Sequence, residues 1–185
     1  MAVTPSTMLP LGTVAPDFTL LDTVSGNTSS LDQLKSPVAT LIMFICNHCP
    51  YVKHVNSELV RLANDYQSKE VSMVAISSND VINYPQDGPD RMKETALELG
   101  YTFPYLYDES QQVAGDYQAA CTPDFYLFGP DMKLVYRGQL DSSRPGNRLP
   151  VTGEDLRRAL DCLITGKDVP SEQVPSVGCN IKWKY

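Results

Sequence analysis

Two cysteines separated by two residues, Cys46 and Cys49, are the residues in this chain best suited to carry out chemistry. Thiols three positions apart on a helix lie on the same side, close enough to form a disulfide and to be reduced again. If a helix begins at this pair, its dipole and its unpaired backbone N–H groups favour the thiolate of Cys46, and a protonated His48 adds to that effect. We therefore expect Cys46 to form a mixed disulfide with a substrate and Cys49 to resolve it.

The segments on either side of the pair have the patterns of a strand followed by a helix. Val38–Ile45 is apolar apart from Thr40, as in a strand that is covered on both faces. From Val52 to Tyr66 apolar residues recur at intervals of three and four with charged residues between them, which predicts an amphipathic helix. The pair thus stands where a buried strand ends and a helix begins.

The rest of the chain alternates between these two patterns. Strands are predicted over residues 71–77 and 103–107, and a hairpin is predicted from 125–128 to 133–137. Helices are predicted to begin at Pro89, to cover residues 109–119, and to follow Thr152 and Asp155, which are spaced as in a capping box before the apolar stripe Leu156, Ala159, Leu160 and Leu163. The order predicts an α/β fold with a central mixed β-sheet flanked by helices.

The dipeptide Thr122-Pro123 stands directly before the predicted hairpin. A proline at a strand entrance can follow a cis peptide bond, which leaves nearby backbone groups free to pair with an extended substrate. The alternative from local sequence is an ordinary trans proline that starts a strand.

The other three cysteines are isolated in the sequence. Cys121 precedes Thr122, so we expect it near Cys46, either as an additional thiol or as a small buried residue. Cys179 is a candidate third thiol if the tail reaches the pair, and otherwise a thiol without a role. Cys162 lies between two leucines of the last helix and is interpreted as part of the core.

A metal site is the main alternative use of the pair. C-x-x-C is half of a structural zinc site, but the sequence contains no second C-x-x-C and no H-x-x-x-H. Together with His48 and His54, the soft thiolates of Cys46 and Cys49 would also suit Cu(I). The favoured interpretation requires neither a metal nor another cofactor.

Composition and charge exclude several classes of partner. The chain has 185 residues with 15 Lys and Arg against 22 Asp and Glu, a net charge of −7, which disfavours binding to nucleic acid or anionic membranes. Its longest apolar run is about half of the roughly 20 residues that a membrane-spanning helix needs. The N-terminus lacks the pattern of a secretory signal, and the odd number of cysteines suits reduced thiols, so we expect a cytoplasmic protein.

Several of these motifs together resemble the thioredoxin superfamily. The motifs are Gly12-x-x-Ala15-Pro16-Asp17-Phe18-x-Leu20, Cys46-x-x-Cys49-Pro50, Thr122-Pro123 and Phe125-Tyr-Leu-Phe128, and the first is similar to the redoxin branch of alkyl hydroperoxide reductase and thiol-specific antioxidant proteins. Arg144-Pro-Gly and the segment from Pro175 to Lys184 resemble the peroxiredoxin-like 1 group of thioredoxin-like proteins. The resemblance implies a thioredoxin-like fold, a Cys46/Cys49 redox couple and a cis bond before Pro123. It also implies an N-terminal extension (1–10), a thioredoxin-like domain (11–164) and a C-terminal tail (165–185).

Departures from the resembled families refine the expected activity. Thioredoxins have Gly-Pro between the cysteines, whereas this chain has Asn47-His48. A His just before the second Cys is similar to protein disulfide isomerases, which predicts a couple less reducing than thioredoxin. Peroxiredoxins have a Thr or Ser where Cys46 stands, three residues before the peroxidatic position occupied by Cys49-Pro50.

We therefore expect a thiol-disulfide oxidoreductase that acts on disulfide-containing proteins or small thiols and exchanges electrons with a donor thiol system. One alternative is a peroxiredoxin-like peroxidase whose peroxidatic thiol is Cys49 or Cys46. A Cu(I)- or Zn(II)-binding redox carrier and a redox-regulated interaction module are the others.

Overall fold

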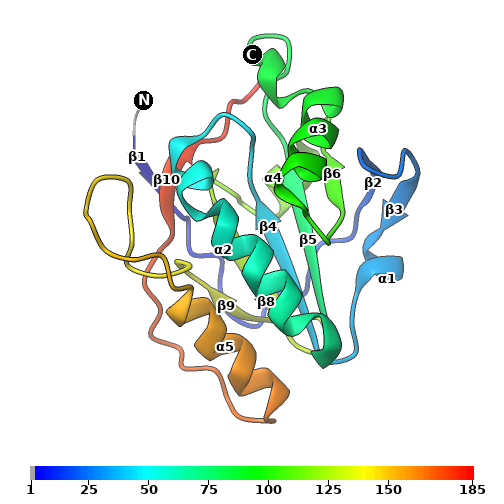
Figure 1. Ribbon diagram of the computed structural model, residues 1–185. Helices are drawn as coiled ribbons and strands as arrows, with labels where there is room; N and C mark the ends of the chain where they lie inside the picture. Colours follow the sequence, from blue (N-terminus) through cyan, green and yellow to red (C-terminus); the bar gives the residue numbers. More distant parts are fainter. Residues whose placement is uncertain (1–2) are drawn as a thin grey trace.

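A central mixed β-sheet organises the computed structural model, which describes residues 3–185. Within this range seven strands pair in the order β3-β2-β6-β5-β4-β8-β9 (Figure 1). They are β2 (Thr19–Asp22), β3 (Thr28–Ser30), β4 (Ala39–Phe44), β5 (Val71–Ser77), β6 (Tyr105–Tyr107), β8 (Asp124–Phe128) and β9 (Leu134–Arg137). Strands β4, β5 and β6 are parallel, and the remaining neighbours are antiparallel.

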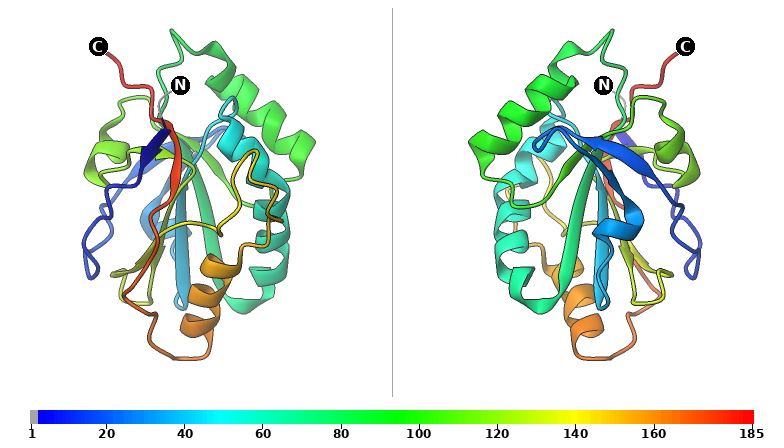
Figure 2. Two further views of the ribbon diagram at one scale, coloured as in Figure 1. Left: turned by 90° about the vertical axis from the view of Figure 1, so that its left-hand side faces the viewer. Right: turned by 90° about the vertical axis from the view of Figure 1, so that its right-hand side faces the viewer.

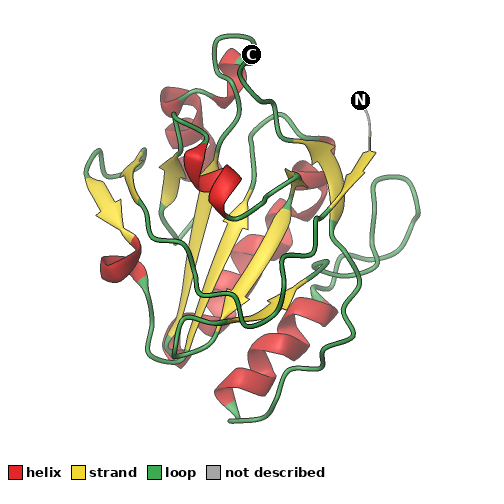
Figure 3. Ribbon diagram, turned by 180° about the vertical axis from the view of Figure 1, so that it is seen from behind, coloured by secondary structure: helices red, strands yellow, loops and turns green. Residues whose placement is uncertain are grey.

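Helices cover the sheet on both faces, which confirms the predicted α/β class. The helices are α1 (Leu31–Leu34), α2 (Pro50–Tyr66), α3 (Pro89–Leu99), α4 (Gln112–Asp116) and α5 (Glu154–Ile164). The side views show α2, α3 and α5 on one side of the sheet and α4 with the N-terminal segment on the other (Figure 2). Seen from behind, the three long helices lie beyond the strands (Figure 3).

Strand β4 alternates its side chains between two cores. Leu41 and Met43 belong to the core shared with α2, α3 and α5, whereas Ile42 and Phe44 pack into the core that contains α4. All six residues of β4 are buried. A strand buried on both faces needs apolar residues at every position, which is why its run in the sequence is continuous.

A smaller sheet joins the two ends of the chain to the region before Pro123. Among the described residues it contains β1 (Val3–Pro5), β10 (Val177–Asn180) and β7 (Cys121–Thr122), in the order β1-β10-β7. Both pairs are antiparallel, with Cys179 opposite Thr122 on one side and opposite Val3 on the other. The C-terminal tail (165–185) therefore contains a strand.

Two helix boundaries differ from the sequence prediction. Helix α4 is shorter than the predicted 109–119 because Gln111 and Gln118 adopt left-handed backbone conformations at its ends. The predicted capping box before α5 is wrong, since the N-cap residue is Gly153 with a φ of +68°. Asp141 instead accepts hydrogen bonds of 2.7 Å from the backbone N–H groups of Thr152 and Gly153.

Among the described residues, no helix is both long enough and apolar enough to cross a bilayer.

A substitution at Gly178 would test how tightly the tail packs against β7, because a Cβ atom there would overlap the carbonyl group of Thr122. We expect Gly178→Ala to separate β10 from β7 and to lower the free energy of unfolding by roughly 1–3 kcal/mol, as other overpacking substitutions do. Urea unfolding and the rate of Cys179 alkylation would measure the two effects.

Gly115→Ala is the matched control, since a Cβ on this residue of α4 has nothing within 4 Å. It should stabilise the protein by about 0.5–1 kcal/mol, as Ala in place of Gly usually does in a helix. Equal stability and equal Cys179 alkylation in the two variants would contradict the tight packing of β10 on Thr122.

Candidate active site

The two cysteines lie between the end of β4 and the start of α2. Cys49 is the N-cap residue of α2, and Pro50, whose fixed φ suits the first turn of a helix, is the first helical residue. Both cysteines are buried, with Cys46 2% exposed and Cys49 0% exposed. The two thiols are within hydrogen-bonding reach of each other.

Thr122 contacts both sulfurs. Its Oγ1 lies 3.6 Å from Cys46 Sγ, and its carbonyl oxygen lies 3.2 Å from Cys49 Sγ, which donates to it while Cys49 carries its proton. The peptide bond between Thr122 and Pro123 is cis, as the family resemblance implied. The strand entrance is therefore part of the site.

A buried carboxylate, Asp87, organises the turn that contains the pair. It lies at the end of the short 3₁₀ helix Pro85–Asp87 and accepts hydrogen bonds from the backbone N–H groups of Asn47 (2.9 Å) and His48 (3.2 Å). Asn79 donates to its second oxygen at 2.8 Å. These two backbone N–H groups, which precede α2, thus bind Asp87 rather than Cys46.

His48 is held by the same carboxylate. Its Nδ1 lies 2.5 Å from Asp87 Oδ2 and 3.9 Å from Cys46 Sγ, and its ring stacks on Tyr84 with centroids 5.4 Å apart. Because one ring nitrogen faces both groups, a proton on it is donated to the nearer Asp87. His48 is thereby oriented by Asp87 rather than by Cys46.

Asn47 fixes the turn from its other side. Its side chain donates to the carbonyl of Gln86 at 2.8 Å and accepts from the hydroxyl of Tyr105 at 3.1 Å. Both residues between the cysteines therefore contact the segment that precedes α3, and Asn47 also contacts β6.

The surroundings of Cys46 and Cys49 shift the pKa values of the two thiols in opposite directions. Hydrogen bonding from Cys46 lowers the pKa of Cys49 to about 4, against the opposing effect of burial, with further donors in Cys179, Thr122 and the backbone of Val52 at the start of α2. The hydrogen bond to Cys49 raises the pKa of Cys46 well above its ordinary value, and burial and the charge of Asp87 raise it further. These shifts favour a thiolate on Cys49 and a thiol on Cys46, which is opposite to the sequence prediction of a Cys46 thiolate.

Cys121 and Cys179 lie beside the pair. Cys179 is 3% exposed, stands opposite Thr122 in the smaller sheet, and is within hydrogen-bonding reach of Cys49. Burial, followed by that hydrogen bond, raises its pKa to about 12. Cys121 Sγ contacts the carbonyl of Pro123 at 3.6 Å, and burial raises its pKa, so it is a buried thiol of low reactivity. Cys162 is half-buried on α5.

A cavity of about 850 Å³ opens beside His48. Tyr84 and residues of the tail form much of its wall, which consists of His48, Asp80, Asn83, Tyr84, Asn180, Ile181, Lys182, Trp183 and Tyr185. Lys182 Nζ lies 5.7 Å from the centre of the Tyr84 ring. His48 is the residue of the cysteine-bearing turn that lines this cavity.

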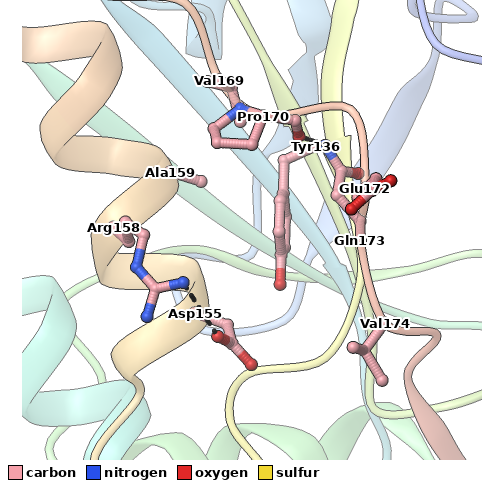
Figure 4. Close-up of a pocket in the computed structure, with 9 residues that line it drawn as sticks. All are labelled: Tyr136, Asp155, Arg158, Ala159, Val169, Pro170, Glu172, Gln173 and Val174. Carbon is pink, nitrogen blue, oxygen red and sulfur yellow. Dashed lines mark hydrogen bonds and ion pairs between the residues drawn. The ribbon is translucent and has the colours of Figure 1, made fainter.

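A second, smaller cavity of about 150 Å³ lies between α5 and the segment before β10. Figure 4 shows Tyr136, Asp155, Arg158 and six other residues around it, none of which is a cysteine. Cys46 and Cys49 therefore do not face this cavity.

The ligand atoms of Cys46, His48 and Asp87 lie within 4.8 Å of one another, which makes them a group that could hold a metal ion among the described residues. His54 is not in this group, unlike in the copper site considered from the sequence. A metal bound through Nδ1 would have to replace the hydrogen bond from His48 to Asp87.

Asp87, Asn79 and Tyr84 were not expected from the sequence. They belong to the segment between β5 and α3, whose residues 78–88 gave only the pattern of a long polar loop. No motif links them to the cysteines, because their contacts bridge about 40 positions along the chain.

Comparison with known proteins places the chain in a family. The AhpC/TSA family matches residues 11–137, whereas no curated protein matches the chain. A crystal structure described as an uncharacterized conserved protein from Geobacillus kaustophilus is 62% identical, with a TM-score of 0.98 over 100% of this chain and 97% of the other.

Two further structures extend the likeness. A hypothetical protein from Sinorhizobium meliloti 1021 is 48% identical, with a TM-score of 0.95 over 98% of each chain. The thioredoxin domain of a thiol-disulfide oxidoreductase from Bacteroides vulgatus is 22% identical, with a TM-score of 0.59 over 70% of this chain and 88% of that one, and shares the fold. The sheet, the cysteine pair at the start of α2 and these matches together show that the chain belongs to the AhpC/TSA family, within the redoxin branch of the thioredoxin superfamily, and has a thioredoxin-like fold.

Proposed function

We propose that the protein is a thiol-disulfide oxidoreductase in which Cys46 and Cys49 cycle between dithiol and disulfide. The observation that carries this proposal is the contact between the two thiols at the start of α2, with both sulfurs against Thr122. The substrates would be disulfide-containing proteins or small thiols.

The proton distribution of the reduced pair supports a role as an oxidant of substrate thiols. A substrate thiolate attacks Cys46 Sγ of the disulfide, and Cys49 leaves as a thiolate that its low pKa stabilises. A second substrate thiol then attacks the substrate sulfur of the mixed disulfide, and Cys46 leaves and regains its proton. The substrate dithiol becomes a disulfide while the enzyme gains two electrons.

The reverse reaction uses the same atoms. Cys46 Sγ attacks a substrate disulfide and gives its proton to the substrate sulfur that leaves, and the Cys49 thiolate then attacks Cys46 Sγ and releases the second substrate sulfur as a thiolate. An electron-donor thiol system would reset the pair, and the expected cytoplasmic location would supply such a system.

Substrate access differs from the sequence expectation. The backbone beside Pro123 was expected to hold an extended substrate, but β10 of the same chain already pairs with Thr122. A substrate therefore approaches through the cavity beside His48, which suits a small thiol or a thiol on a protruding protein segment.

A peroxidase is a second candidate, favoured by the low pKa of Cys49, because peroxides are attacked by thiolates. Cys49 would then become a sulfenic acid, and Cys46 would condense with it to give the disulfide and water. Loss of one peroxide per disulfide formed, within the time that the substrate assay takes, would favour this reaction over exchange.

A redox-buffer titration tests the proposed couple. With alkylation and mass mapping, Cys46 and Cys49 should convert together at a potential above the roughly −270 mV of thioredoxin. Because the reduced pair holds one proton, the potential should fall by about 30 mV per pH unit between pH 5 and 8, rather than the roughly 59 mV of a pair that takes up two. Cys162→Ser is the matched control and should leave both values unchanged.

Two results would contradict the proposal. Independent oxidation of Cys46 and Cys49 would remove the couple itself. A fall of roughly 59 mV per pH unit would show that Cys49 is a thiol at neutral pH, and the leaving-group argument would fail.

The charge of Asp87 can be tested by Asp87→Asn. The substitution removes a negative charge beside Cys46, so we expect the pKa of Cys46 to fall and its alkylation to move to lower pH. At a fixed pH below that pKa, the thiolate fraction rises about tenfold when the pKa falls by one. Mass mapping of Cys46 alkylation across pH 6–10 would measure this.

Asp90→Asn is the control, because Asp90 is exposed and lies three residues further along the chain. It should leave the alkylation profile of Cys46 in place. If Asp87→Asn also leaves that profile unchanged while the protein stays folded, Asp87 has no electrostatic effect on Cys46.

A further inference from the structure

The pairing of β10 with β7 directs Cys179 toward the redox pair. Residues directly opposite each other in an antiparallel pair project their side chains on the same face, and Thr122 is opposite Cys179. The Thr122 side chain contacts Cys46 Sγ on that face, and its carbonyl group contacts Cys49 Sγ. Cys179 is accordingly within hydrogen-bonding reach of Cys49.

Contacts on both sides of Cys179 keep this segment in place. Ser176 Oγ donates to the carbonyl of Pro123 at 2.6 Å, and Ile181 N donates to the carbonyl of Ala120 at 3.1 Å. Lys182 N donates to Asn79 Oδ1 at 2.9 Å, and Asn79 also donates to Asp87. The tail is thus connected through one side chain to the carboxylate that holds His48.

Cys49 is within hydrogen-bonding reach of both Cys46 and Cys179, and all three thiols are buried. Cys49 is thus the central thiol of the three. A central sulfur with a thiol on each side can exchange one disulfide partner for the other.

Building on the proposed function, we propose that Cys179 is a third redox cysteine of this site, which attacks Cys49 of the Cys46–Cys49 disulfide to form a Cys49–Cys179 disulfide.

The exchange needs no external oxidant. The Cys179 thiolate bonds to Cys49 Sγ, the Cys46–Cys49 bond breaks, and Cys46 leaves as a thiolate that takes up the proton released by Cys179. One disulfide is replaced by another, so the protein is neither oxidised nor reduced. The Cys46–Cys49 disulfide that starts the step is supplied by the proposed activity.

The new disulfide would change what the site offers to a substrate. Cys46 becomes a thiol in a protein that still holds two oxidising equivalents, and Cys49 is no longer free to resolve a mixed disulfide on Cys46. The bond also joins the start of α2 to β10 covalently. The site would therefore have two oxidised forms. The form with the Cys46–Cys49 disulfide reacts with substrates, and the form with the Cys49–Cys179 disulfide retains the two oxidising equivalents.

The Cys46→Ser variant cannot form the Cys46–Cys49 disulfide, and it leaves Cys49 with Cys179 as its neighbouring thiol. Treated with oxidised glutathione, this variant should form the Cys49–Cys179 disulfide and release reduced glutathione. A thiol held in contact acts at an effective concentration of millimolar or more, so below about 0.1 mM glutathione this disulfide should exceed the Cys49–glutathione adduct roughly tenfold. Alkylation and peptide mapping without reduction would measure both.

Two double variants serve as controls for the neighbouring thiols. Cys46→Ser with Cys179→Ser should accumulate the glutathione adduct on Cys49, whereas Cys46→Ser with Cys121→Ser should still form the Cys49–Cys179 disulfide. Peptide mapping of the oxidised wild-type protein should detect both the Cys46–Cys49 and the Cys49–Cys179 disulfide. In the Cys179→Ser variant it should detect only the Cys46–Cys49 disulfide. The wild-type mapping also covers the case in which the Cys46→Ser variant does not fold.

Other results would overturn the inference. A stable Cys49–glutathione adduct with Cys179 open to alkylation would exclude the exchange, and so would pairing of Cys49 with Cys121. If the wild-type protein forms the Cys46–Cys49 disulfide but never the Cys49–Cys179 disulfide, the redox role of Cys179 is refuted and the proposed function is not. If wild type forms no Cys46–Cys49 disulfide at all, the proposed function itself fails.

Discussion

The backbone pairing between Thr122 and Cys179 joins parts of the chain that are far apart in sequence. This pairing places the tail against Thr122, which also contacts the sulfurs of Cys46 and Cys49. Because the hydrogen bonds are made by backbone groups, they fix the position of the tail without using a side chain of the redox pair. The site is therefore assembled from the β4–α2 junction, from the residues before β8 and from the tail.

A second constraint is the placement of one buried negative charge. Asp87 has two backbone N–H groups, an imidazole and an amide around its carboxylate, which compensate the cost of burying it. The hydrogen bond between the two thiols, then burial and the charge of Asp87, disfavour a thiolate on Cys46, and the same hydrogen bond favours one on Cys49. Asp87 thus adds to an asymmetry that the contact between the cysteines already creates.

The local parts of this site could be predicted from the sequence. The apolar run of β4, the helical periodicity of α2 and the cysteines between them are patterns within about 30 residues, and they were interpreted correctly. The cis bond before Pro123 followed from the family resemblance, since local sequence left both isomers open.

The long-range parts could not be predicted. Asp87 meets the cysteine turn across 40 positions, and strand β10 is four residues long with a glycine inside it, which gives no strand pattern. The capping box failed for a different reason, because Gly153 adopts a left-handed conformation and becomes the N-cap residue in place of Thr152.

The position of the tail has a consequence for the shape of the cavity beside His48. Lys182, Trp183 and Tyr185 line this cavity, and they follow β10 in the chain. Because β10 pairs with Thr122, a displacement of this strand would move Cys179 and one wall of the cavity together. The width of the cavity and the distance between Cys179 and Cys49 are therefore set by the same strand pairing.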